Sequence, residues 1–177
     1  TLVVDKEGTE SNLLTLEGFV DAGTNFQPLR ELKNKKLFVT SSGSKFMLVS
    51  DNESKSPLYE LKLSALPSKI LASNSTKFAL VSYFANKNLE VIDLQNERVL
   101  SQIPIDDIAK DAEIDSVNNI AYISVPAANS IYAVDLNSGK LVKTIKTAQA
   151  PGKIAVSEDG TSLVFIDNLT QDICHME

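Results

Sequence analysis

The 177-residue chain has few of the side chains on which acid–base, metal and redox chemistry depend. It contains one cysteine, one histidine, two arginines and no tryptophan. Because Cys174 is the single cysteine, no disulfide can form within this sequence, and cysteine usage leaves the compartment open. One imidazole and two guanidinium groups provide little for proton transfer near neutral pH, so we expect a non-enzymatic protein without catalytic residues.

Other absences narrow the class of protein further. No apolar run approaches the length of roughly 20 residues that a membrane-spanning helix requires, and no signal peptide is visible. The net charge of −6 is spread along the chain without a basic cluster, which argues against a nucleic-acid partner because phosphate binding requires concentrated lysine and arginine. The chain also lacks glycine-rich phosphate loops, Gly-x-Ser-x-Gly elbows and His-Glu-x-x-His motifs, so no cofactor is expected.

What the sequence does contain is a repeat of about 42 residues. Its two best copies, residues 77–94 and 119–136, align without a gap, so that Asp93 corresponds to Asp135. A unit of this length, with short alternating apolar runs and tight turns, forms one four-stranded sheet that cannot bury its own faces and must stack on neighbouring copies. The repeat therefore predicts an all-β fold, a β-propeller of four-stranded antiparallel blades with negligible helix.

Markers at the start of each unit divide the chain into blades. Pro67, Ala109 and Pro151 stand 42 residues apart, and Pro28 lies 39 residues before Pro67. We predict full blades at 28–66, 67–108 and 109–150, and half blades at 1–27 and 151–177. About four blades' worth is present, within a single domain.

Strands can be assigned within these units. In the unit 109–150 they are predicted at 111–115, 120–125, 130–136 and 141–146, and in the unit from Pro28 at 29–32, 37–40, 46–50 and 58–63. A rival register aligns residues 45–50 with 77–82, only 32 residues apart, which would leave that blade one strand short. Gly139 and Gly160 lie in predicted hairpin turns, where we expect a positive φ.

Residues 129–167 resemble the repeat of the YVTN-type, surface-layer-like β-propellers. The resemblance rests on an Asn-containing turn, the strand end at Val134–Asp135, the Pro151–Gly152 entry and an Asp159–Gly160 hairpin. It departs at Glu158, where the family usually has proline. Most members are seven-bladed, secreted, periplasmic or on the cell surface, and bind or scaffold other proteins without known catalytic residues. The absence of tryptophan excludes the Trp-Asp signature of another propeller class.

Propeller geometry places the turns between second and third strands on the same rim as the connections between blades, and such loops are where binding occurs. In this chain the rim would hold residues 84–88, 126–130 and 168–172, together with 64–67, 104–110 and 147–150. The candidates for partner binding are Phe84, Asn86, Lys87, Asn88, Asn129, Ser130 and Asn168. Phe84 is the most suggestive, because a turn aromatic either anchors a partner or folds back on its own hairpin.

Two groups of residues are weaker candidates for metal binding. Asp106, Asp107 and Asp111 could gather carboxylates for a hard cation near the channel mouth, but their spacing matches no known calcium loop, and a solvated loop is the alternative. Cys174 and His175 could supply soft ligands, although this segment is expected to be disordered or to begin a strand. We therefore predict no metal site.

The expected function is a non-enzymatic β-propeller binding or scaffold module of the periplasm or cell surface. The alternatives are an accessory domain of a periplasmic redox or metal-handling system and a lactonase-type hydrolase, since similar propellers include lactonases and haem-containing nitrite reductases. The two half blades could pair to close a ring of four. Because the family is mostly seven-bladed, we instead expect a portion of a larger ring, completed by absent residues, a second chain or a protein partner.

Overall fold

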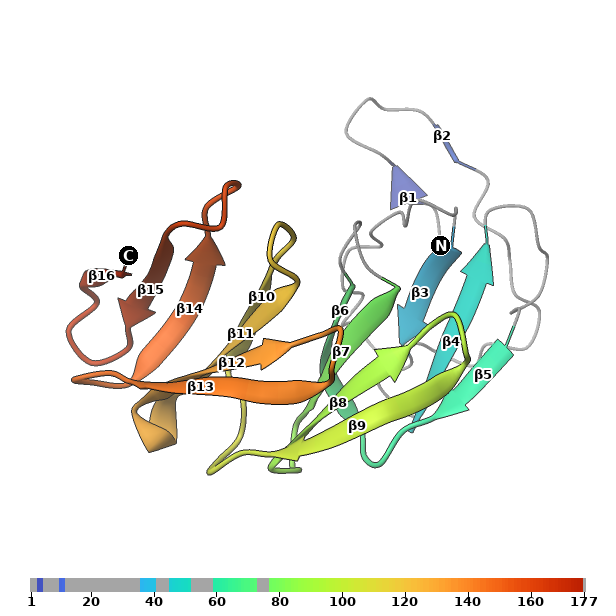
Figure 1. Ribbon diagram of the computed structural model, residues 1–177, viewed down its shortest axis with the longest axis horizontal. Coiled ribbons are helices and arrows are strands. Elements are labelled where there is room, and N and C mark those ends of the chain that lie inside the picture. The colour runs from blue at the N-terminus through green and yellow to red at the C-terminus, as the bar shows by residue number, and fades with distance from the viewer. Residues whose placement is uncertain are drawn as a thin grey trace.

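The computed structural model describes residues 3–4, 10–11, 36–40, 45–51, 59–72 and 77–176. These residues form sixteen strands and one 3₁₀ helix, and every strand pairing is antiparallel (Figure 1). The strands make five separate sheets, each with its strands in sequence order. The predicted all-β class is confirmed for the described residues, which include no α-helix.

Two central sheets contain four strands each, as predicted for a blade. One consists of β6 (Pro67–Ala72), β7 (Phe78–Tyr83), β8 (Asn88–Asp93) and β9 (Arg98–Pro104). The next consists of β10 (Asp111–Asp115), β11 (Ile120–Val125), β12 (Ser130–Asp135) and β13 (Lys140–Lys146), with the 3₁₀ helix η1 (Pro126–Ala128) between β11 and β12. The strands predicted for residues 109–150 agree with these bounds to within one residue at each end.

A three-stranded sheet precedes the central pair. It contains β3 (Lys36–Thr40), β4 (Phe46–Asp51) and β5 (Tyr59–Lys62). The N–H of Leu63 donates to the carbonyl of Lys45, just as the N–H of Ile105 donates to that of Lys87 beside the third and fourth strands of the next sheet, so β4 is the third strand of its unit. The rival register, which made residues 45–50 a second strand, is therefore wrong. The strand predicted at 29–32 lies outside the described residues, as do most of residues 1–35.

The last sheet has three strands rather than the two predicted for a half blade. It contains β14 (Pro151–Val156), β15 (Leu163–Asp167) and β16 (Ile173–Met176). The third strand forms because Cys174 and Met176 pack against the apolar cluster that includes Leu163 and Phe165. The same cluster includes Ile131 of β12, which is distant in sequence, so the short run after Asp167 carried no clear strand signal of its own.

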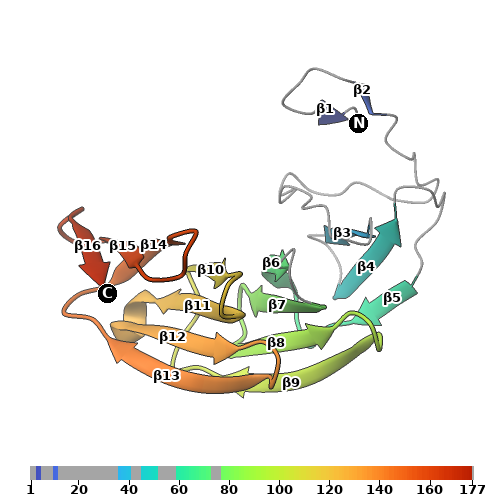
Figure 2. The same ribbon diagram turned by 45° about the horizontal axis from the view of Figure 1, so that its top comes forward.

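The sheets stack face to face around an open arc, with β6, β10 and β14 on the concave side and β9 and β13 on the convex side (Figure 2). Apolar clusters fill the interfaces between successive sheets. All residues of β7 are buried, and so are five of the six residues of β12, because both faces of each central sheet are covered. This confirms the prediction that the repeats bury one another.

The two ends of the arc, as the described strands form it, do not meet. Among the described strands, β1 (Val3–Val4) pairs with β2 (Glu10–Ser11), and neither joins the sheet of β14, β15 and β16. The composite blade that would have closed a four-membered ring is therefore not formed by these strands.

Aspartates at strand ends stabilise the turns. In three turns of the two central sheets, an aspartate oxygen accepts the N–H groups of the residues two and three positions later, beginning at Asp93, Asp115 and Asp135. The predicted positive φ is confirmed at Gly139 (φ 65°) and Gly160 (φ 71°). Glu97, which occupies the position of Gly139 one repeat earlier, also has a positive φ of 55°.

Asp159 in the β14–β15 turn is expected to make folding sensitive to acid. Hydrogen bonds from the Ser157 hydroxyl and the Thr161 backbone N–H lower the pKa of Asp159 to about 2. A depressed pKa stabilises the folded state above the unfolded value of about 3.9, and this contribution is lost as the pH falls towards 2. Thermal melts of Asp159→Asn should therefore depend less on pH between about 4 and 2 than those of the wild type. Identical pH dependence of the two proteins would contradict this assignment.

Candidate functional site

The candidate site is the rim formed by the β7–β8, β11–β12 and β15–β16 turns and the connections between sheets. Backbone hydrogen bonds join each turn to a neighbouring connection. The N–H of Phe84 donates to the carbonyl of Leu66 at 3.3 Å, and that of Thr147 donates to Asn129 at 2.9 Å. The N–H of Asn168 donates to Ala150 at 2.9 Å. The structure thus brings together the loop segments that propeller geometry predicted to share one rim, and their backbones are held in place by the sheets.

The β7–β8 turn makes the most side-chain contacts along this rim. Asn86 Nδ2 donates to Ser64 Oγ at 3.3 Å, towards the preceding connection. On the other side, Lys87 Nζ donates to Asp107 Oδ2 at 2.8 Å, and its ammonium group lowers the pKa of Asp107. This turn therefore bridges the connections that precede and follow its own sheet, and Phe84, between these contacts, is half exposed at 50%.

The predicted candidates differ in how accessible they are. Lys87, Asn129 and Asn168 are exposed, whereas Asn86 and Asn88 are half-buried. The prediction that Ser130 is a rim residue available to a partner is corrected, because its side chain is fully buried. Its hydroxyl donates to the carbonyl of Ala128 at 2.8 Å and accepts from Lys146 Nζ at 3.0 Å, so it secures the η1 turn and does not face a partner. The sequence did not single out Leu169, which is 75% exposed on the same rim.

The three acidic candidates are directed to different partners. Asp107 pairs with Lys87, and Asp106 lies next to Tyr132, whose hydroxyl accepts its backbone N–H at 3.2 Å. Asp111 accepts from Lys69 Nζ at 2.5 Å and from the backbone N–H of Ile154 at 3.1 Å. Across the described ranges, no three acidic, histidine or cysteine side chains come together in a group that could hold a metal ion.

The contacts of Asp111 join three successive sheets. Lys69 lies in β6, Asp111 in β10 and Ile154 in β14, which are the innermost strands of their sheets. Lys69 and Asp111 stand 42 residues apart, so the repeat places a cation and an anion at equivalent positions. Asp111 therefore links neighbouring sheets, and this spacing was a signal available in the sequence.

Cys174 and His175 cannot act together as ligands from one side of β16. Cys174 pairs with Phe165 and is half-buried, whereas His175 pairs with Val164 and is exposed. Successive residues of a strand point to opposite faces of its sheet. The two side chains therefore lie on different faces.

A buried polar cluster beneath the rim was not predicted. Tyr83 and Glu90 are 0% and 1% exposed, and the Tyr83 hydroxyl donates to Glu90 Oε2. Gln102 Nε2 donates to Glu90 Oε1 at 2.8 Å. Burial and the bond to Glu90 raise the pKa of Tyr83 well above its ordinary value. Both carboxylate oxygens of Glu90 are thus hydrogen-bonded, as burial of a polar group requires, and the cluster supports the strand that leads into Phe84.

The comparisons with known proteins bear on the fold. No protein-family model and no curated protein matches the sequence. Among solved structures, 1190 chains match. One of them is hydrazine synthase from Kuenenia stuttgartiensis, with a TM-score of 0.70 and 17% sequence identity over 90% of this chain and 49% of that chain. The fold is β-propeller-like. The chain spans about half the length of the chain it matches, and a likeness at this identity, on a fold shared so widely, does not select a function.

In the described ranges, no helix has the length and hydrophobicity needed to cross a membrane.

Proposed function

We propose that this chain is part of a β-propeller that serves as a non-enzymatic protein-binding or scaffold module, with its binding surface on the rim described above. The observation that carries the proposal is the β7–β8 turn, where hydrogen bonds to both neighbouring connections hold Phe84 half exposed. An aromatic side chain on a rigid loop supplies apolar contact area at little cost in conformational entropy. Leu169 adds a second exposed apolar side chain to the same rim.

We further propose that the chain belongs to a larger ring of the YVTN type, located in the periplasm or at the cell surface, and that it has no catalytic role. Three features support this proposal. The arc of sheets is open (Figure 2). The chain covers 49% of the hydrazine synthase chain that it resembles. The sequence pattern around Pro151–Gly152 and Asp159–Gly160 resembles that of the family.

The rim proposal predicts that binding can be lost without loss of folding. We expect a Phe84→Ser, Asn86→Ala, Lys87→Ser triple variant to capture at most about one tenth as much partner as the wild type in pull-downs from native envelope extract. Its melting temperature should stay within a few degrees of the wild type, because Phe84 and Lys87 are exposed and the Asn86–Ser64 hydrogen bond lies at the surface, where substitutions change stability by roughly half a kcal/mol or less. The measurements are quantitative pull-down and thermal melts.

Val117→Ser is the matched control for this experiment. Val117 is 59% exposed in the β10–β11 turn, which lies at the opposite ends of the strands from the rim. This variant should retain the partner as well as the wild type. Equal retention by the triple variant would place the binding surface elsewhere.

A further inference from the structure

Two lysines occupy equivalent places on the rim, just before or at the start of the third strands of neighbouring sheets. The carbonyl of Lys45 accepts the N–H of Leu63 at 2.7 Å, and the carbonyl of Lys87 accepts the N–H of Ile105 at 2.8 Å. The two lysines are 42 residues apart in the sequence, and both are exposed. The next equivalent position is Asn129. The repeat therefore gives the rim a lysine in two successive turns and an uncharged residue in the third.

The repeat does not supply these two lysines with the same counter-ion. Lys87 Nζ lies 2.8 Å from Asp107 Oδ2, in the connection that follows its own sheet. The residue 42 positions before Asp107 is Ala65. Among the described residues, no acidic side chain forms a salt bridge with Lys45. Lys45 is thus the cation of an ion pair whose acidic member is present in one repeat and replaced by alanine in the other.

The connection formed by residues 63–66 joins the Lys45 turn to the turn that carries Phe84. Leu63 donates its N–H to Lys45, and the carbonyl of Leu66 accepts the N–H of Phe84 at 3.3 Å. Three residues of chain span at most about 11 Å, so the backbones beside Lys45 and Phe84 are close neighbours. The rim therefore brings an exposed ammonium group and a half-exposed aromatic ring to either side of one short connection.

We propose that this part of the rim, formed by Lys45, Ala65 and Phe84, binds an acidic segment of a separate protein. A carboxylate of the segment pairs with Lys45, as Asp107 pairs with Lys87 in the next repeat. A neighbouring apolar side chain of the segment packs on Phe84. This partner chemistry rests on the proposed function, because the same rim carries the contacts.

The two contacts contribute in different ways to recognition. An exposed ion pair adds little affinity because water and salt screen it, so apolar contact with Phe84 supplies most of the binding free energy. The ion pair with Lys45 fixes the orientation of the segment and disfavours segments that carry lysine or arginine there. The net charge of −6 does not oppose this pairing, because charges more than about 8 Å away are largely screened at physiological salt.

The test begins with a library of random dodecapeptides displayed on phage, which is selected against the full 177-residue chain. We expect the recovered peptides to place aspartate or glutamate near a leucine or an aromatic residue more often than the unselected library does. The peptide recovered most often is then synthesised with a fluorescein label, and its affinity is measured by fluorescence anisotropy. A selection that recovers no binding peptide, or peptides without acidic residues, would overturn the proposal.

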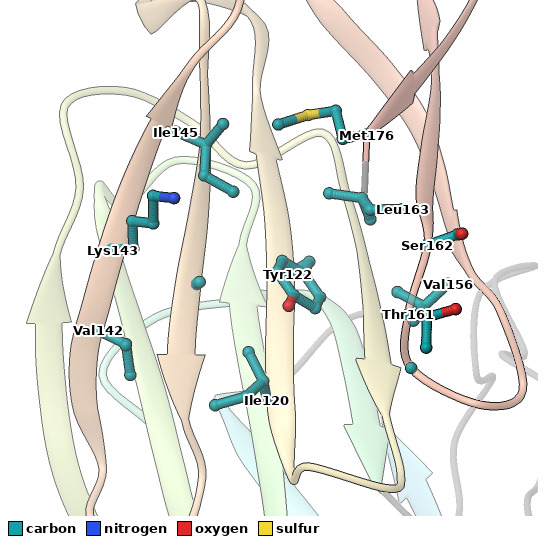
Figure 3. Close-up of a pocket in the computed structure, with 12 residues that line it drawn as sticks. Ile120, Tyr122, Val142, Lys143, Ile145, Val156, Thr161, Ser162, Leu163 and Met176 are labelled. Carbon is teal, nitrogen blue, oxygen red and sulfur yellow. The ribbon is translucent and has the colours of Figure 1, made fainter.

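Charge reversal at Lys45 tests the ion pair. Lys45→Glu should weaken binding of the selected peptide at least about tenfold, because a like charge then faces the peptide carboxylate. Lys143→Glu is the matched control, since Lys143 is exposed and lines a pocket between β13 and the last sheet, away from the rim (Figure 3). It changes the net charge equally and should leave the affinity unchanged. Equal weakening by both variants would mean that only net charge matters, and the pairing with Lys45 would be wrong.

Ala65 provides a second pair of variants. Ala65→Asp introduces the acidic residue that the next repeat has at Asp107, so it should pair with Lys45 and weaken peptide binding at least about tenfold. Ala65→Asn adds a side chain of the same size without the charge, and it should keep most of the affinity. Circular dichroism checks that both variants fold. Equal affinity of these two variants for the peptide would contradict the proposed pairing.

The rim triple variant separates this proposal from the proposed function. It should lose peptide binding together with partner capture, because it removes Phe84. Recovered peptides that lack acidic residues but fail to bind the triple variant would leave the rim as the binding surface and overturn the acidic partner. Peptides that bind the triple variant as well as the wild type would overturn both proposals. Self-association in light scattering that Lys45→Glu abolishes would make a second copy the occupant, and the separate partner would be wrong.

Discussion

Replacing Leu136 by alanine is expected to lower the free energy of unfolding by about 2–5 kcal/mol. Leu136 is fully buried in the cluster between the two four-stranded sheets, and its backbone N–H donates to the carbonyl of Asn119 at 3.0 Å. Shortening the side chain removes apolar contacts and leaves a cavity that the rigid sheets close only in part. Urea denaturation, followed by circular dichroism, measures the difference.

Leu141→Ala is the control for this result. Leu141 belongs to the same hairpin, and its replacement by alanine removes the same atoms, but its side chain is 41% exposed. Its replacement should cost less than about 1.5 kcal/mol, since much of the side chain already contacts water. If both variants lost the same stability, Leu136 would not be the leucine that fills the interface between the two sheets.

Replacing Gly160 by valine is expected to destabilise the protein by about 2–4 kcal/mol, of which about 1–3 is the cost of a left-handed backbone for a residue other than glycine. Gly160 has a φ of 71°, and a Cβ atom there would lie 2.7 Å from both carboxylate oxygens of Asp115. Asp115 is 2% exposed and accepts the N–H groups of Val117 and Asn118. The substitution therefore strains its own turn and displaces the buried Asp115 carboxylate that holds the β10–β11 turn in the neighbouring sheet.

Glu158→Val tests whether the effect belongs to the conformation of Gly160. Glu158 is exposed in the same turn, and it is not among the residues with positive φ. The same side chain placed there should change stability by no more than about half a kcal/mol. Thermal and urea melts of the two variants give the comparison. A Gly160→Val protein as stable as the wild type would show that the turn can readily adopt another geometry.

The period of the chain allowed much of the local structure to be predicted. The strands of residues 109–150 and the positive φ of Gly139 and Gly160 follow from alternating apolar residues and turn chemistry, which act over a few neighbouring positions. The position of β16 was harder to predict, because a four-residue strand is stabilised mainly by the sheet on which it packs. Strand signals fade where the packing partner is distant in sequence.

The candidate site, too, could be predicted from the sequence only in part. The sequence placed Phe84 and Lys87 in a turn that leads out of a buried strand, and hydrogen bonds join this turn to both neighbouring connections. It could not show that Ser130 is buried, with its hydroxyl hydrogen-bonded to Lys146 of the adjacent strand. Loop exposure is decided by side chains that arrive from elsewhere in the chain.

The sequence by itself determined that this protein is built of stacked four-stranded sheets, because a repeat of about 42 residues cannot bury both faces of one sheet alone. Only the tertiary structure decided which surfaces stay open. Ile131 is fully buried and Ile173, its equivalent 42 residues later, is 78% exposed, although both occupy the third strand of a sheet. The difference arises because β14–β16 cover the face that carries Ile131, whereas the face that carries Ile173 is not covered by a described sheet. Burial is a property of neighbours in space, which a repeated sequence specifies only where the next repeat is present to pack against it.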